Sequence, residues 1–152
     1  MDAKAAVDRM KEAIIRGPGE GKPINVIGDK QTIKLNGEQT GGLFALIEQN
    51  NAPGATVPLH VHTREDELFY VCEGEVQFQV GEMEIAGMSG TTVYLPRGVP
   101  HGFRVRKQTR ALLSVYPSGA EKMFVELSEL PPGPPDFEKV KEICGRYGVY
   151  FF

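Results

Sequence analysis

The first part of the chain has apolar residues at helical spacing. They recur every three or four positions, at Ala3, Val7, Met10 and Ile14. This spacing predicts an amphipathic helix over residues 2–16, with Asp2 as its cap and Gly17-Pro18 as its end. Residues 19–23 are then a short link.

From residue 24 to residue 117 the helical pattern is replaced by short apolar runs. β-Branched and aromatic residues dominate, and glycine, proline and asparagine interrupt them at intervals of roughly ten residues, which is the rhythm of a β-sandwich or closed barrel. Turns are expected at residues 41–42, 50–54, 72–74 and 87–90. The sequence therefore predicts an all-β domain here.

Helical periodicity returns after Pro117. Residues 118–121, Ser-Gly-Ala-Glu, have the form of a capping box, and an apolar face follows before Pro131-Pro132. A second helix is expected from Asp136 to the stop at Gly148. We expect both helices to pack outside the barrel, and the apolar end, residues 149–152, to dock on the barrel or on a second subunit.

Length and charge limit the function classes. The chain has 152 residues and a formal net charge of -3, which suits one domain over residues 1–152 and argues against a nucleic-acid partner. The domain divides into an N-terminal helix and link (1–23), a β-barrel (24–117) and a helical segment (118–152). One local basic cluster is interpreted as a solvated strand face, and binding of an anion or a partner is the alternative: Arg104, Arg106, Lys107 and Arg110.

Two cysteines, Cys72 and Cys144, are too few for a disulfide framework and have no metal-site spacing. We expect both to be reduced, buried packing residues. The charged N-terminus has no apolar signal core, and no apolar run reaches membrane length. A cytoplasmic protein with no membrane partner is the expectation.

The strongest chemical signal is the placement of the three histidines. His60 and His62 are two residues apart, so an extended strand sends both imidazoles to one face. Glu67 heads the next apolar run, and His101 follows a turn with two prolines. Together they can close around one divalent transition metal. Glu65 and Asp66 are interpreted as solvated loop charges, with Asp66 as the substitute ligand if the strand register differs by one. A solvated histidine pair, or a barrel that works without metal, is the alternative.

These residues also resemble the two motifs of the cupin family. Gly54, His60, His62, Glu67 and Gly74 have the spacing of the first motif. The stretch that ends in His101 is similar to the second motif, which it matches at Gly90, Pro96, Arg97, Gly98 and His101. Val105 stands where the family has an asparagine, and that asparagine is not a metal ligand.

The resemblance implies a cupin-type double-stranded β-helix, or jelly-roll barrel, that pairs as a homodimer. Residues 60–71 and the end of the chain are similar to single-domain cupins described as quercetin dioxygenase-like. Such proteins bind a metal through three histidines and a glutamate, here His60, His62, His101 and Glu67. The ligand set favours iron, manganese, nickel or cobalt, and zinc and copper also fit it.

Aromatic residues around the histidines suggest a pocket for a small aromatic or enolic molecule. Strand alternation places Phe69 and Val71 with Glu67, and Phe103 with His101. Further wall candidates, with orientation unassigned, are Phe78, Tyr94 and Phe44. For each of them, ordinary core packing is the alternative.

The resemblance implies a metal-dependent oxidoreductase of dioxygenase type, and Glu67 is expected to be both a metal ligand and the catalytic base. Two alternatives stay open. One is a cupin that binds a small molecule without turnover, as a sensor or carrier, and the other is a metal-dependent isomerase or decarboxylase.

Overall fold

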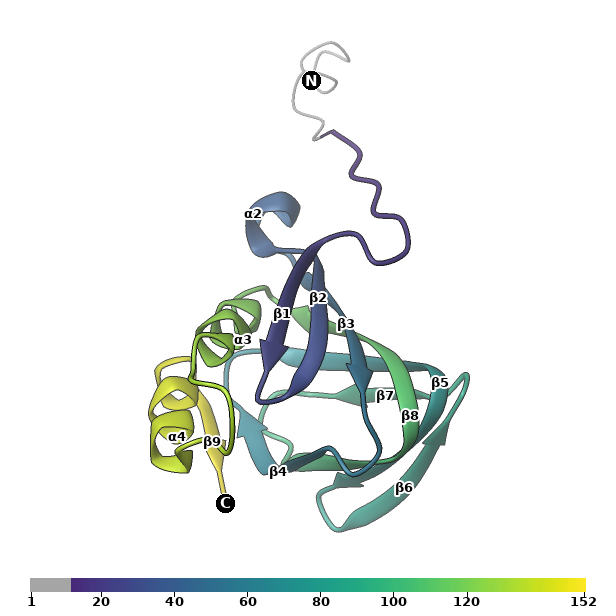
Figure 1. The fold of residues 1–152 in the computed structure, drawn as a ribbon, viewed down its shortest axis with the longest axis vertical. Coiled ribbons are helices and arrows are strands. Elements are labelled where there is room, and N and C mark those ends of the chain that lie inside the picture. The colour runs from purple at the N-terminus through teal and green to yellow at the C-terminus, as the bar shows by residue number, and fades with distance from the viewer. Residues whose placement is uncertain (1–11) are drawn as a thin grey trace.

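The computed structural model describes residues 12–152, and within them nine strands form one curled antiparallel sheet (Figure 1). The strands are β1 (Lys22–Val26), β2 (Asp29–Leu35), β3 (Ala45–Asn51), β4 (Thr56–His62), β5 (Asp66–Val80), β6 (Met83–Met88), β7 (Thr92–Leu95), β8 (His101–Tyr116) and β9 (Val149–Phe151). The helices are α2 (Gly37–Thr40), α3 (Ala120–Ser128) and α4 (Phe137–Arg146). The curled sheet confirms the all-β, cupin-type barrel that the sequence predicts.

The two longest strands hold the barrel together. β5 and β8 pair along their length, from Asp66 opposite Tyr116 to Val80 opposite His101, and each also pairs with two other strands. The sheet therefore closes on itself around these strands, which lie side by side in Figure 1.

The turn expected at residues 72–74 is wrong, because β5 continues through it. The register with β8 shifts around Glu73, and Gly74 has φ +95°. A Cβ on Gly74 would come within 2.2 Å of the Gln108 carbonyl oxygen. This glycine therefore serves a bulge in a long strand, where only a residue without a side chain fits.

The barrel interior is filled by alternate residues of the strands, as a pleated strand requires. Ile47, Val71 and Val115 are fully buried there. The core cluster comprises Ile33, Ala45, Ile47, Phe69, Val71, Val76, Phe78, Val93, Leu95, Leu113, Val115 and Ala120. The same alternation leaves Cys72 half-buried, so the expectation of a buried thiol is wrong there.

Helices α3 and α4 lie together beside the barrel, as predicted (Figure 1). Their apolar faces meet β1 and β9 in a second core cluster: Val26, Met123, Leu127, Val140, Ile143, Cys144 and Val149. Asp136 caps α4 by accepting a hydrogen bond from Glu138 N. The capping box expected at Ser118 is absent, because Gly119 is the N-cap of α3 and no side chain caps it.

The N-terminal helix expected over residues 2–16 falls mainly on residues 1–11, outside the described part of the chain. Residues 12–16 are not helical, so the prediction is wrong for them. Ile14 and Ile15 are 40% and 86% exposed. A short helix gains most of its stability from burying an apolar face, and this segment buries little.

The end of the chain docks on the barrel, as predicted. β9 pairs with β4, with Val149 opposite His62 and Phe151 opposite His60. Val149 is buried, whereas Tyr150 and Phe152 are 53% and 76% exposed. The last residues therefore add an edge strand to the wall that carries two histidines.

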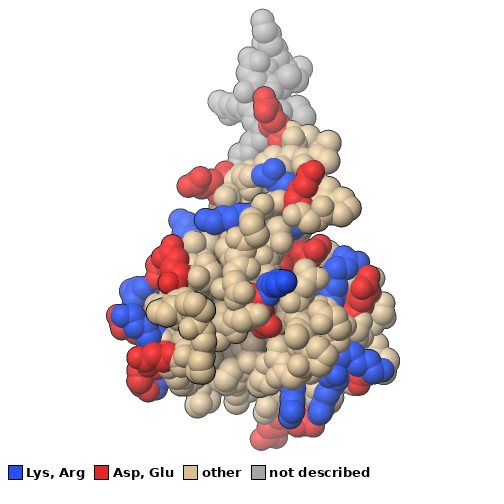
Figure 2. All heavy atoms as spheres, in the orientation of Figure 1, with Lys and Arg blue, Asp and Glu red and all other residues tan. Residues whose placement is uncertain are grey.

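Charged side chains of both signs lie intermixed on the face shown in Figure 2, mostly towards its margins. Arg104 and Arg106 are exposed on the outer face of β8, as predicted. Among the described residues, no helix combines the length and apolar character needed to cross a membrane.

Candidate metal centre

Three strands bring the four expected ligands together inside the barrel. His60 and His62 come from β4, Glu67 from β5 and His101 from β8. Their four potential ligand atoms all lie within 4.8 Å of one another, and all four residues are buried. The cluster could therefore hold one metal ion.

Local backbone structure explains this convergence. His60 lies directly opposite His101 across the β4–β8 ladder, and His62 shares the face of His60 because the two are separated by one residue. The turn before His101 is fastened to β4, since Gly98 N donates to the His62 carbonyl oxygen at 2.8 Å.

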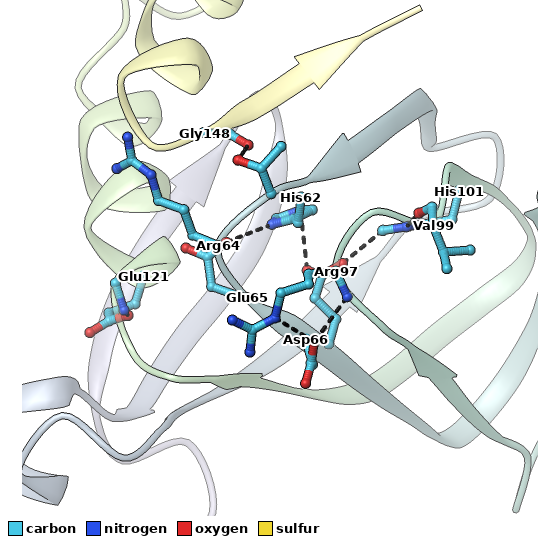
Figure 3. Close-up of polar contacts among 12 residues, drawn as sticks. His62, Arg64, Glu65, Asp66, Arg97, Val99, His101, Glu121 and Gly148 are labelled. Atoms are coloured by element: carbon cyan, nitrogen blue, oxygen red, sulfur yellow. Dashed lines mark hydrogen bonds and ion pairs between the residues drawn. The ribbon is translucent and has the colours of Figure 1, made fainter.

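Each imidazole is oriented through its Nδ1 atom. His60 Nδ1 lies 2.8 Å from the Pro58 carbonyl oxygen, and His101 Nδ1 lies 3.0 Å from that of Val99. His62 Nδ1 lies 3.3 Å from Glu65 Oε2 (Figure 3). Because carbonyl and carboxylate oxygens accept, each Nδ1 is the protonated nitrogen, and each Nε2 keeps the lone pair that binds metal.

The contact between Glu67 and His101 indicates that a cation belongs here. Glu67 Oε2 and His101 Nε2 are 2.7 Å apart, and Glu67 Oε1 is 3.5 Å from His62 Nε2. Glu67 Oε2 and His101 Nε2 are nevertheless buried without a hydrogen bond. With Nδ1 protonated, two lone pairs face each other, which is unfavourable unless a cation lies between them. Neighbouring ligands at about 2.1 Å from an octahedral metal are roughly 3 Å apart, so the spacing fits.

The charges of the cluster suit metal binding. Burial lowers the pKa of His60 to about 4, and His101 adds to this effect, so His60 is neutral at neutral pH. Burial pushes the pKa of Glu67 upward, but the three histidines outweigh it and lower that pKa to about 2. Burial likewise opposes protonation of His62, yet Glu67 and Glu65 raise its pKa. One carboxylate and three imidazoles therefore surround one point.

Glu65 is not the solvated loop charge that the sequence suggested. It is 3% exposed, and its carboxylate holds His62. Its position in a polar stretch, Thr63 to Asp66, hid this role, because the bend that turns Glu65 inward is not visible in the sequence pattern.

Asp66 lies outside the cluster of four potential ligands, so it is not the substitute metal ligand that a shifted strand register would require. Its Oδ1 accepts from Arg97 N at 2.9 Å and from Arg97 Nε at 3.0 Å (Figure 3). Tyr94 OH donates to its Oδ2 at 3.2 Å. These hydrogen bonds, led by those from Arg97, lower the pKa of Asp66 to about 2. Asp66 thereby ties the start of β5 to the turn that precedes His101.

A cavity of about 500 Å³ opens beside the cluster, between the barrel and the C-terminal helices. All four potential ligands line it, together with two of the expected wall residues, Phe69 and Phe103. Further apolar lining comes from Leu113, Met123, Phe124, Leu127, Phe137 and Phe151. The size and apolar character suit a small organic ligand.

The other four wall candidates lie elsewhere. Val71 and Phe78 are buried in the barrel core and do not line this cavity. Tyr94 is 58% exposed, because it lies opposite Leu68, whose neighbours Glu67 and Phe69 point inward. Phe44 packs against Tyr116 at 5.8 Å between ring centroids, also away from the cavity.

Comparison with known proteins agrees with this geometry. The family model described as "Cupin domain" matches residues 48–116, which include all four potential ligands. Quercetin 2,3-dioxygenase of Bacillus subtilis (strain 168) is 29% identical over 101 residues, covering 66% of this chain. The match spans 30% of the length of that relative.

Solved structures support the same fold. A predicted oxalate decarboxylase from Thermotoga maritima is 20% identical with a TM-score of 0.60, covering 70% of this chain and 100% of its own. An RmlC-like cupin from Shewanella frigidimarina is 20% identical with a TM-score of 0.59, covering 74% and 98%. At such identities the likeness concerns the fold alone. The two motifs, the barrel and the family match over residues 48–116 therefore agree, and this part of the chain is similar to the cupin domain.

Proposed function

We propose that this protein is a metal-dependent oxidoreductase of dioxygenase type that acts on a small aromatic or enolic molecule. The observation that carries the proposal is the buried cluster of three histidines and one glutamate in the wall of an apolar cavity of about 500 Å³. Iron, manganese, nickel or cobalt would suit this function, and zinc or copper also fits the donor set.

A redox-active metal held by four protein ligands would supply open coordination positions for a chelating substrate and dioxygen. The protein's own residues define what can approach those positions. Phe69 and Phe103 form an aromatic corner, with ring centroids 5.9 Å apart, in the cavity that the four ligands line. Flat apolar molecules match such walls better than sugars do.

Glu67 is the residue we propose as the base. Its pKa, lowered to about 2, keeps it ionised, and it is buried at the cavity wall. A carboxylate of this kind is a weak base, so it can take a proton only from an acidic group. Enolic and phenolic hydroxyls become acidic beside a metal, which is a further reason to favour these substrates.

The relative from Bacillus subtilis also supports the proposal, since its name is that of a dioxygenase for a flavonol. The match spans 30% of that protein, so the substrate is not transferred to this chain. A flavonol is one example of the aromatic enols that the cavity would suit.

The test is oxygen uptake on addition of catechols, flavonols and β-diketones, with the protein loaded separately with each of the four favoured metals. We expect uptake by the wild type, a loss of at least about a hundredfold in Glu67→Gln because the base is removed, and wild-type rates in Glu73→Gln. Glu73 is the matched control, because it lies on the same strand with its side chain 69% exposed. No uptake with any metal would contradict the proposal. Binding without uptake would instead support a sensor or carrier, and turnover without oxygen an isomerase or decarboxylase.

A further inference from the structure

The cavity beside the metal centre has a second polar region, formed by three amide side chains. Gln31 from β2 and Gln49 and Asn51 from β3 line it, and they are 6%, 5% and 3% exposed. Gln31 lies opposite Gln49 across the β2–β3 ladder, and Asn51 is on the same face of β3 as Gln49. Three amides are therefore grouped on one stretch of the barrel wall.

Two of these amides are not satisfied within the protein. Gln31 Oε1 and Asn51 Oδ1 are buried and have no hydrogen-bond partner. Buried polar side-chain atoms in folded proteins nearly always have one, and leaving them unpaired destabilises the protein. Turning either amide about its last bond would place the NH₂ group there and leave a donor unpaired instead.

The fold gives no structural reason for amides at these positions. Asn51 lies opposite Thr109, whose hydroxyl already donates to the Lys107 carbonyl oxygen at 2.7 Å, and Gln49 lies opposite Ala111. Ala45 and Ile47, on the same face of β3, are fully buried apolar residues. An apolar side chain would fill the positions of Gln31 and Asn51 without an unpaired polar group.

We propose that Gln31 and Asn51 form a subsite that binds a hydroxyl group of the ligand. Amides that lack partners in the protein gain them when a ligand occupies the cavity. Since the metal ligands line the same cavity, the ligand class is an aromatic molecule with two polar ends. Its enolic or phenolic end binds at the metal centre, and this part of the proposal rests on the proposed function. A separate hydroxyl of the ligand binds to the amides.

The surroundings favour a neutral hydroxyl over an anionic group. Among the described residues that line this cavity there is no lysine or arginine, whereas Asp29 is among them. A carboxylate or phosphate would enter without a cation to pair with, apart from the metal centre itself. A hydroxyl can both donate to and accept from an amide, so it fits either orientation of the side chains.

The test compares two flavonols that share the same chelating enol. One is 3-hydroxyflavone, and the other is quercetin, which has additional ring hydroxyls. Their affinities are measured under nitrogen by fluorescence titration, so that no turnover occurs. We expect the wild type to bind quercetin at least about tenfold more tightly than 3-hydroxyflavone, as expected for about one or two added hydrogen bonds.

Substitution then separates the subsite from the rest of the cavity. In Asn51→Leu and in Gln31→Met the preference for quercetin should fall by about fivefold or more, while the affinity for 3-hydroxyflavone stays the same. Asn50→Leu is the matched control, because Asn50 is the neighbouring residue on β3, faces the other way and does not line the cavity. It should keep the full preference. Melting temperatures identify any variant that fails to fold. Because the two substitutions lie on different strands, one variant still tests the subsite if the other does not fold.

Several outcomes would overturn the subsite. These are equal affinities of the wild type for the two flavonols, no binding of quercetin, an unchanged preference in both folded variants, or an equal loss in Asn50→Leu. Oxygen uptake is recorded separately in air. A preference for quercetin that depends on Gln31 and Asn51, without any oxygen uptake, would support the subsite and contradict the dioxygenase. Oxygen uptake without this preference would support the dioxygenase and contradict the subsite.

Discussion

At the scale of single residues, the orientation of each imidazole is as important as its presence. His60 and His101 are fixed by backbone carbonyls, whereas His62 depends on the side chain of Glu65. Groups that hold a ligand's second nitrogen fix its tautomer and strengthen its binding to metal. Glu65 is thus the one residue of this orienting set that a substitution can remove without touching a ligand.

Replacing Glu65 by alanine should weaken metal binding by about tenfold to a hundredfold, because the His62 imidazole loses the acceptor for its Nδ1–H. Glu65→Gln should keep most of the affinity, since its amide oxygen still accepts. The measurement is a competition titration with a metal chelator. Glu73→Ala, on the exposed face of β5, is the control. Wild-type affinity in Glu65→Ala would show that the contact does not orient the ligand.

Strand alternation, a local property, was enough to predict the pair His60 and His62, and the resemblance to the two cupin motifs added Glu67 and His101. Strand alternation was not enough for Glu65, Gln31 or Asn51. Their burial depends on a bend and on cross-strand neighbours, which no local pattern contains. Tyr94 shows the same limit, because its direction follows from its pairing with β5.

At the scale of elements, β9 links the C-terminal helices to the metal centre. It pairs with the strand that carries two histidines, and the Phe151 ring lies 5.7 Å from the His60 ring. The sequence predicted docking of this segment from its apolar character. It could not predict which strand would receive it, because that contact joins distant parts of the chain.

Deleting residues 149–152 should lower the free energy of unfolding by about 3 kcal/mol, since it leaves the edge of β4 unpaired and removes Val149 from the second core cluster. Urea denaturation measures this change. Phe152→Ala is the control, because Phe152 is 76% exposed, and it should stay within about 0.5 kcal/mol of the wild type. Unchanged stability after the deletion would mean that β9 contributes nothing to the fold.

Helix α4 provides a prediction about pH. Burial raises the pKa of the Cys144 thiol from 9.0 to about 11. The folded state therefore keeps the proton more tightly than the unfolded chain does. This difference between the folded and unfolded pKa of Cys144 makes a contribution to the free energy of unfolding that is fully present below pH 9. The contribution is lost as the pH rises towards 11.

At neutral pH, a maleimide reagent should therefore label the native protein at Cys72 and spare Cys144, with both thiols labelled after unfolding. Mass spectrometry of tryptic peptides identifies the labelled residue. Equal labelling rates for the two thiols in the native protein would contradict the burial of Cys144.

At the scale of the whole molecule, two long strands organise both the barrel and the site. β5 contributes Glu67 and β8 contributes His101, and each strand pairs with several others. The regular interruptions in the sequence predicted a barrel of this class. They also suggested a false turn at residues 72–74, because a glycine that permits a bulge looks the same as one that ends a strand. The two strands that close the barrel thus also carry Glu67 and His101.

The most direct test of the account is a count of metal ions per chain, by mass spectrometry of the purified, tag-free protein. We expect close to one transition-metal ion per chain, and at least about a tenfold lower occupancy in His60→Ala and in His62→Ala, because each removes one of four ligands. Asn50→Leu, on the outer face of β3, should retain the ion. A protein that holds no metal even after reconstitution, or variants with wild-type occupancy, would contradict the claim that His60, His62, Glu67 and His101 form a metal centre.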